Sequence, residues 1–301
     1  MNAPLRCALF LGRFPVLSET FILRQITGLL DLGHTVDLYA DKRGDTDRMH
    51  PEVTSYRLLE RTTFMDMPEA SAPWELSAWP LAGETWVPGS SEAIPNWRRL
   101  ADALPALRRC LERAPALAEE ALDPVRAGHA AHSLSALYRL DRLSGRPAAY
   151  DVLHAHFGPV GEAFRFARAL WRAPLVVSFH GYDFTTLPRQ QGPGLYARLF
   201  AAADLVTVNS RFTRGRLAQL GCPEAKLRLL PVGLALDGAD GFSFTPRVRP
   251  AGQRPRLITV ARLVPIKGHE FVLQALARLR AAGRDLHYDL VGDGQIGRAH
   301  V

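Results

Sequence analysis

The sequence predicts an α/β protein with parallel sheets. Short apolar runs alternate with amphipathic stretches of helical length between residues 7 and 40 and again between residues 151 and 230. A fresh alternation begins after a segment rich in glycine and proline. Strands separated by helices of this length run parallel and are covered by helices on both faces. With 47% hydrophobic and 22% charged residues, the 301-residue chain has a globular composition and room for two such domains.

A strand, a helix and a second strand are predicted near the N-terminus. Residues 7–11 and 35–40 are apolar runs, and residues 19–31 repeat their apolar side chains at the helical period. Ser18 is a suitable N-cap for this helix, and Gly33 lies where the helix is expected to end. Together these elements form one βαβ unit.

Residues from about 62 to 146 differ in character and predict a helical insertion within the first domain. Tryptophans and many prolines interrupt short helical stretches there. In one stretch, arginines surround an apolar set at helical spacing, which consists of Trp97, Leu100, Leu104, Leu107 and Leu111. Such a helix can lie on an anionic membrane, or it can pack on the core with a solvated basic face. Packing on the core is the favoured alternative, and Pro105 would kink the helix in either case.

The alternation returns at Asp151. Strands are expected at residues 152–157, 175–179, 205–209 and 227–230, with helical stretches between them. After the linker, a strand at 256–261, a helix at 268–282 and a strand at 286–291 predict the start of a second domain. Two strands and one helix cannot cover both faces of a sheet. We therefore expect a first domain at 1–236, a linker at 237–255 and an incomplete second domain at 256–301.

Cysteine usage, charge and hydropathy limit the class of protein. The 3 cysteines lack a C-x-x-C pair, which argues against a disulfide framework and a zinc ribbon. The net charge of +7 is spread along the chain, so the phosphates of a sugar nucleotide or an acidic lipid surface are expected partners and nucleic acid is not. No apolar stretch suits a signal peptide or reaches the ~18 residues of a membrane span. A cytoplasmic location is expected, with peripheral contact to the inner face of the membrane as a further expectation.

Two basic residues stand where a ligand is expected to bind in the second domain. Arg262 and Lys267 follow the first strand of that domain, and ligands of open α/β sheets bind beyond the carboxyl ends of strands. A guanidinium and a nearby ammonium suit a departing diphosphate, because negative charge grows on the leaving oxygen. The alternative is a solvated pair in a loop of an arginine-rich protein.

Three histidines mark strand ends in the first domain. His180 follows the apolar strand 175–179, so its ring is expected at a strand tip, with Asp183 nearby. His154 and His156 lie two apart on a strand and therefore share one face. The alternatives are a structural histidine at a strand end, or a metal site formed by His154, His156 and His180.

Two loops complete the candidate set. Ser18, Glu19 and Thr20 are polar groups ahead of a predicted helix N-terminus, where backbone N–H groups can receive an anion. Gly292 and Gly294 begin a formal G-x-G-x-x-G after the last predicted strand. No helix or acidic residue follows as a dinucleotide site requires, so this segment is predicted to be a turn.

Four segments in this order resemble glycosyltransferase family 4, and especially its exopolysaccharide and colanic-acid-type branch. They are residues 14–22, 178–184, 231–234 and 260–268. The resemblance implies the GT-B fold, with an acceptor-side and a donor-binding Rossmann-like domain. It implies that Arg262 and Lys267 hold the donor diphosphate and that Gly292 and Gly294 turn beside the donor.

The same resemblance assigns roles in the first domain. It implies that His180 contacts the transferred sugar and supports catalysis, with Asp183 as a helper. It places His154 and His156 on the acceptor side without a metal. Ser18, Glu19 and Thr20 would face the acceptor, although this branch lacks the glycine pair that many relatives carry in that loop.

The implied reaction moves a sugar from a nucleoside-diphosphate sugar to a saccharide or a lipid-linked saccharide, with retention of configuration, in cell-surface or extracellular polysaccharide synthesis. The nucleotide sugar is a co-substrate, and no cofactor or metal is expected. In the family a Glu-x7-Glu pair follows several dozen residues beyond the glycine turn, and no such pair follows Gly292 and Gly294 in the given sequence. The alternatives are a truncated, non-catalytic acceptor-binding remnant and a metal-dependent hydrolase using His154, His156 and His180.

Overall fold

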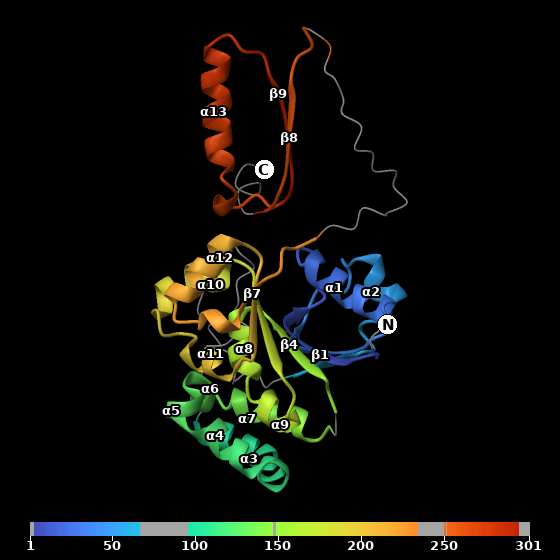
Figure 1. Ribbon diagram of the computed structural model, residues 1–301, viewed down its shortest axis with the longest axis vertical. Coiled ribbons are helices and arrows are strands. Elements are labelled where there is room, and N and C mark those ends of the chain that lie inside the picture. The colour runs from blue at the N-terminus through green and yellow to red at the C-terminus, as the bar shows by residue number, and fades with distance from the viewer. Residues whose placement is uncertain (1–2, 67–95, 147–148, 234–249, 251, 295–301) are drawn as a thin grey trace. The chain divides into compact units, whose positions relative to one another are not determined.

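The computed structural model describes residues 3–66, 96–146, 149–233, 250 and 252–294 (Figure 1). The chain divides after Gly233 into two compact units, unit 1 and unit 2. Predictions for residues 67–95, for most of the linker and for residues 295–301 lie outside the described residues, as does the side chain of Trp97. The predicted domain limits stay predictions.

Unit 1 contains a seven-stranded parallel sheet with the order β3-β2-β1-β4-β5-β6-β7. The strands are β1 (Arg6–Phe14), β2 (Thr35–Arg43), β3 (Thr62–Phe64), β4 (Val152–His156), β5 (Leu175–Phe179), β6 (Leu205–Val208) and β7 (Leu227–Leu229). The predicted parallel α/β architecture is confirmed, and the first residues of the predicted insertion form the edge strand β3. The strand order reverses between β1 and β4, and such switch points are where open α/β sheets bind ligands.

Each face of this sheet buries its own core. The helices are α1 (Thr20–Asp31), α2 (Pro51–Ser55), α8 (Gly158–Phe164), α9 (Ala167–Trp171), α10 (Tyr182–Gln191), α11 (Ala197–Ala202) and α12 (Arg211–Gln219). Cys7, Leu9 and Leu11 pack with α1 and α2, whereas Ala8 and Phe10 pack with α8. This alternation of faces along β1 follows from the two-residue period of a strand.

The start of α1 differs from the prediction. Glu19 is the N-cap residue and makes no side-chain capping bond, whereas Ser18 lies outside the helix. The amide of Glu19 bonds the carbonyl of Val16 at 3.2 Å, so a turn precedes the helix. Ser18 belongs to that turn, which is why it does not cap α1.

The predicted insertion contains a cluster of helices, drawn in green in Figure 1. They are α3 (Asn96–Arg113), α4 (Pro115–Leu122), α5 (Pro124–Ala127), α6 (His129–His132) and α7 (Ser135–Ser144). α3 extends through Pro105 and buries its small residues Ala103 and Cys110 in this cluster. Of the predicted apolar set, Leu107 packs against this cluster, whereas Leu100 and Leu104 remain 57% and 60% exposed. The helix therefore packs as expected, but mainly through its small residues. No helix in the described part of the chain is long and apolar enough to cross a membrane.

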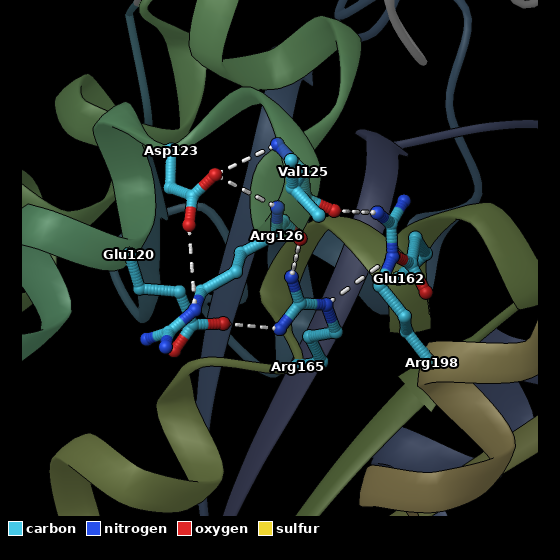
Figure 2. A network of polar contacts seen from close by, with 7 residues as sticks. All are labelled: Glu120, Asp123, Val125, Arg126, Glu162, Arg165 and Arg198. Carbon is cyan, nitrogen blue, oxygen red and sulfur yellow. Dashed lines mark hydrogen bonds and ion pairs between the residues drawn. The ribbon is translucent and has the colours of Figure 1, made fainter.

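Ion pairs join this cluster to the sheet layer, as Figure 2 shows. Arg165 donates to Glu120 at 2.6 Å and to Glu162 at 3.2 Å, so it connects α4 with α8. Arg198 donates to the same Glu162 and to the carbonyl of Val125. These contacts fix α4 and α5 against α8 and α11.

A buried arginine makes a second connection. Arg139 on α7 donates through Nε and Nη2 to the two carboxylate oxygens of Asp41 on β2, at 2.9 and 2.8 Å. Both side chains are almost completely buried, at 1% and 0% exposure. The Nη1 of Arg139 also donates to Ser135. This pair therefore anchors α7 to the carboxyl end of β2.

Unit 2 is a βαβ unit. Parallel strands β8 (Arg256–Val260) and β9 (His287–Val291) are connected through the short 3₁₀ helix η4 (Pro265–Lys267) and helix α13 (His269–Ala281). The predicted strands and helix are confirmed to within one residue at each end. Ile258 and Val260 on β8 are 65% and 74% exposed.

Candidate functional site

Three histidines come together at the carboxyl ends of β4 and β5. His154 and His156 project from the same face of β4, and their rings stack at 4.5 Å between centroids. His180 follows β5, and its ring stacks on His156 at 5.4 Å. β4 pairs with β1 at the switch point of the sheet, so the cluster lies where the fold favours a ligand.

Both ring nitrogens of His154 make hydrogen bonds to protein side chains. The amide of Gln25 on α1 donates to Nδ1 at 3.0 Å, so the proton of His154 is on Nε2, which donates to Ser178 at 2.7 Å. Ser178 in turn lies 2.5 Å from the hydroxyl of Thr207 on β6. The chain of bonds links one helix and three strands. Gln25 and Thr207 are contacts that no motif in the sequence indicated.

His156 and His180 contact each other directly. The Nδ1 of His156 lies 3.2 Å from the Nε2 of His180. The ring of His180 is flanked by Phe21 of α1, at 4.5 Å between centroids, and by Phe157, at 4.8 Å. Phe157 adopts φ +74°, a strained value for a residue with a side chain, at the junction of β4 and α8. Backbone strain of this kind is common at active sites and ligand-binding sites.

Asp183 holds the loops around the cluster together. Its carboxylate is completely buried and accepts from the amides of Gly181 at 2.8 Å, Gly158 at 3.1 Å and His180 at 3.2 Å. A Cβ atom on Gly158 would lie 2.4 Å from the ring of Phe179, so this approach requires glycine. These contacts give Asp183 a positioning role, and its assignment as a catalytic residue stays a prediction.

Burial sets the charge of these groups. It lowers the pKa of His154 to about 4 and that of His180 to about 3, and it lowers the pKa of His156 well below its usual value. Burial also raises the pKa of Asp183 to about 6, although the three backbone amides oppose that shift. Near neutral pH the histidines are therefore uncharged and Asp183 is a carboxylate.

Acidification should destabilise unit 1. Each histidine takes up a proton in the unfolded chain near its ordinary pKa of 6.5. In the folded chain the pKa is lowered to about 4 for His154 and about 3 for His180, and it is also lowered for His156. Unfolding therefore binds protons, and stability falls as the pH falls. The contribution of Asp183 to this pH dependence has the opposite sign, because its pKa of about 6 in the folded chain exceeds the ordinary value of 3.8. Near pH 5, unfolding takes up about two protons in total. The free energy of unfolding should therefore fall by about 2–3 kcal/mol for each unit by which the pH is lowered.

Urea unfolding between pH 7.5 and 4.5 measures this slope. The His156→Leu variant is the matched control, because it removes one titrating group and should reduce the slope by about 1.4 kcal/mol per pH unit. A slope that is unchanged in this variant would contradict the assignment.

The predicted acceptor loop lies at the carboxyl end of β1. Ser18 and Thr20 are exposed and Glu19 is partly buried, immediately before α1 and in its first turn. β1 is the neighbour of β4 in the sheet, so the loop and His156 follow adjacent strands. Contact of Ser18, Glu19 and Thr20 with an acceptor stays a prediction.

In unit 2, Arg262 and the glycine turn lie side by side. Arg262 follows β8, and its carbonyl accepts from Nε2 of the buried His269. The amide of Leu263 bonds the carbonyl of Asp293 at 2.9 Å. A Cβ atom on Gly292 would lie 1.9 Å from the carbonyl oxygen of Ala261, so only glycine permits this approach. Lys267 is exposed at the end of η4.

Metal binding has no candidate group in the parts of the chain that the structure describes, since no three His, Cys, Asp or Glu side chains are grouped for it. The ring nitrogens of His154 are both engaged by protein groups. One ring nitrogen each of His156 and His180 is also engaged. A metal at the three histidines would have to displace these bonds.

The histidine cluster and Asp183 lie within residues 112–233, which match the family model for a glycosyl transferase 4-like domain. Similarity extends along 96% of the chain to the putative colanic acid biosynthesis glycosyltransferase WcaL of Salmonella typhimurium, at 31% identity over 296 residues. Residues 112–233 thus resemble a glycosyl transferase 4-like domain, and the similarity to WcaL extends beyond them. The predicted resemblance is thereby confirmed.

A second glycosyltransferase and a solved structure are also similar to most of the chain. The amylovoran biosynthesis glycosyltransferase AmsK of Erwinia amylovora is 26% identical over 298 residues, which is 97% of this chain and 65% of AmsK. The chain spans 64% of the length of WcaL. The structure of Anabaena Alr3699/HepE in complex with UDP superimposes with a TM-score of 0.52 at 13% identity and covers 98% of this chain and 62% of HepE. That likeness supports the GT-B fold.

Proposed function

We propose that the protein is a retaining glycosyltransferase that moves a sugar from a nucleoside-diphosphate sugar to a saccharide or lipid-linked saccharide. The observation that carries the proposal is the sequence similarity to WcaL, a putative colanic acid biosynthesis glycosyltransferase. The two sequences are 31% identical over 296 residues, which is 96% of this chain. AmsK, which is similar over almost the same span, is named for the synthesis of another exopolysaccharide. Cell-surface or extracellular polysaccharide synthesis is therefore the proposed setting.

The proposed donor site belongs to unit 2. Arg262 and Lys267 would neutralise the charge that grows on the departing diphosphate, which is the step that a transferase must stabilise. The loop of Arg262 lies against the turn of Gly292 and Gly294, where an added Cβ atom would meet the carbonyl groups of Ala261 and Leu263. His180 is proposed to contact the transferred sugar, and Ser18, Glu19 and Thr20 the acceptor. No step in this scheme calls on a metal.

A donor panel tests the proposal. The protein encoded by the complete reading frame is incubated with UDP-glucose, UDP-galactose, GDP-mannose and GDP-fucose, and release of the nucleoside diphosphate is measured with and without lipid-linked saccharide acceptors. We expect one donor to be consumed in an acceptor-dependent manner, with the anomeric configuration of the product retained in its NMR spectrum. Oligosaccharide binding without turnover of any donor would instead support the acceptor-binding remnant.

We further propose peripheral membrane contact through α3. Leu100, Leu104 and Leu111 are exposed on this helix, whose sequence contains five arginines and two acidic residues. Exposed leucines beside cationic side chains are typical of helices that lie in the interface of an anionic bilayer. The proposed partner is therefore an anionic lipid surface.

Vesicle co-sedimentation tests this contact. The double variant L100S/L104S should bind phosphatidylglycerol vesicles at least about 10-fold more weakly, since each leucine contributes about 1.5–3 kcal/mol when buried. The control is Val125→Ser, because Val125 is 84% exposed but lies on α5. Equal binding by L100S/L104S and the unaltered protein, or equal binding to neutral phosphatidylcholine vesicles, would contradict the proposal.

A further inference from the structure

We propose that His156 is a positioning residue that holds His180 in the tautomer with its proton on Nδ1. His180 would then act as a neutral hydrogen-bond donor to an oxygen atom of the bound substrate. The inference rests on the proposed function for the existence of that substrate. It goes further because it assigns the proton to one atom and gives His156 a task that requires no contact with the substrate.

The contact between the two rings allows only two arrangements. The Nδ1 of His156 and the Nε2 of His180 are 3.2 Å apart, so one of them carries the shared proton and the other accepts it. Both rings are neutral near pH 7, because burial lowers both pKa values. A neutral imidazole has a single N–H. The position of the shared proton therefore fixes the second nitrogen of each ring as well.

The second nitrogen of His156 decides between the arrangements. His156 is 1% exposed, and its Nε2 is buried without any partner among the described residues. If His180 donated the shared proton, this Nε2 would carry a buried N–H with no acceptor, which native proteins rarely tolerate. If His156 donates from Nδ1, its Nε2 has only an unused lone pair, which is the less costly case. Donation from His156 to His180 is therefore favoured.

His154 cannot accept a hydrogen bond from the Nε2 of His156. Its ring stacks on that of His156 at 4.5 Å, and both of its nitrogens are occupied by Gln25 and Ser178. It therefore offers no acceptor to the Nε2 of His156. The three rings form a series in which only His180 keeps a nitrogen for use outside the cluster.

That nitrogen is Nδ1 of His180. It is not among the described side-chain atoms that are buried without a partner, and the contact with His156 engages only the other ring nitrogen of His180. With Nε2 accepting from His156, Nδ1 must carry the proton. Phe21 and Phe157 pack against the ring and restrict its rotation. The group presented to a ligand is a fixed N–H, which suits a hydroxyl or phosphate oxygen and cannot accept a proton.

Nitrogen NMR tests the assignment without any substrate. In the 301-residue chain labelled with ¹⁵N-histidine, long-range ¹H–¹⁵N correlations at pH 7.5 distinguish the protonated from the bare nitrogen of each ring. We expect His180 to be protonated on Nδ1 and His156 on Nδ1. Protonation of His180 on Nε2 would overturn the inference, whatever the protein proves to catalyse.

Two variants of His156 provide matched controls. In His156→Asn the amide nitrogen lies close to the position of Nδ1 and can still donate to His180, whereas in His156→Gln it lies close to the position of Nε2. We expect Asn to preserve the Nδ1 tautomer of His180, and Gln to shift it toward Nε2–H, the form that imidazole favours in water. A tautomer of His180 that stays on Nδ1 in both variants would show that His156 does not control it.

The same variants, made in the product of the complete reading frame, connect the tautomer with turnover. His156→Gln should lower kcat about 10-fold, whereas His156→Asn should remain within about threefold of the unaltered protein, since one neutral hydrogen bond contributes about 0.5–1.5 kcal/mol. Equal losses in both variants, despite different tautomers, would leave the tautomer without a role in catalysis and overturn that part of the inference. An inactive unaltered protein would refute the proposed function and leave the NMR result standing.

Discussion

Replacing Arg139 by methionine should lower the free energy of unfolding by about 3–5 kcal/mol. The guanidinium bonds both oxygens of Asp41, and neither side chain reaches solvent. Methionine fills most of the volume but leaves the carboxylate of Asp41 buried with no opposite charge. Urea unfolding at pH 7.5, followed by far-UV circular dichroism, measures the loss.

Two comparisons separate the cost of the unpaired charge from a general loss of packing. The double variant R139M/D41N should recover a large part of the stability, because the uncompensated carboxylate is then gone. Arg108→Ala is the exposed control, since Arg108 is 83% exposed and pairs with Glu112 one turn away, and such pairs contribute at most about 0.5 kcal/mol. If R139M costs no more than Arg108→Ala, the buried pair does not stabilise unit 1.

Replacing Arg262 or Lys267 by alanine should lower turnover on the order of 10²-fold while the fold is retained. Each would remove a positive charge from the proposed site of the departing diphosphate, and removal of one transition-state stabilising group commonly has this effect. The substitutions are made in the protein from the complete reading frame, and kcat and KM for the donor identified by the panel are measured. A loss in kcat is expected to exceed the change in KM, because the charge develops during the reaction.

Arg256→Ala is the matched control for these variants. Arg256 belongs to the same unit, is largely exposed and pairs with Asp289 on β9 at 3.1 Å. It should retain turnover within about twofold, as is usual for exposed charges away from a site. Unchanged turnover in both Arg262→Ala and Lys267→Ala would remove the two residues from the proposed donor site.

Local sequence patterns predicted most of the architecture. The strand at residues 175–179 agrees with β5 at both ends, because a run with four apolar residues is bounded by a proline and by His180 and Gly181. The parallel order followed from the alternation with helices, since a helix between two strands returns the chain to the same edge of the sheet. The three-residue strand β3 has no such pattern and could be found only through its pairing with β2.

The candidate site was predictable only in part. The sequence placed His154 and His156 on one face and His180 at a strand end, because these positions follow from strand periodicity. The contact of His154 with Gln25 joins residues 129 positions apart, and nothing local in α1 indicates it. Likewise, the leucine spacing in α3 predicted an apolar face but not that Ala103 and Cys110 would pack inward. Packing of small residues lets helices approach closely, and this depends on neighbours that a local pattern does not contain.

The central position of β1 has a consequence for how the protein folds. β1 pairs with β2 within one βαβ unit, but its other edge pairs with β4, where Cys7 lies opposite Val152, 145 residues later. At a synthesis rate of about 5–20 residues per second, that partner emerges about 7–30 s after β1. Throughout this interval the nascent chain presents an apolar strand with unpaired amides and carbonyls, a template for pairing with other chains. Newly made unit 1 should therefore depend on chaperone binding at β1 more than a protein whose central strands are adjacent in sequence.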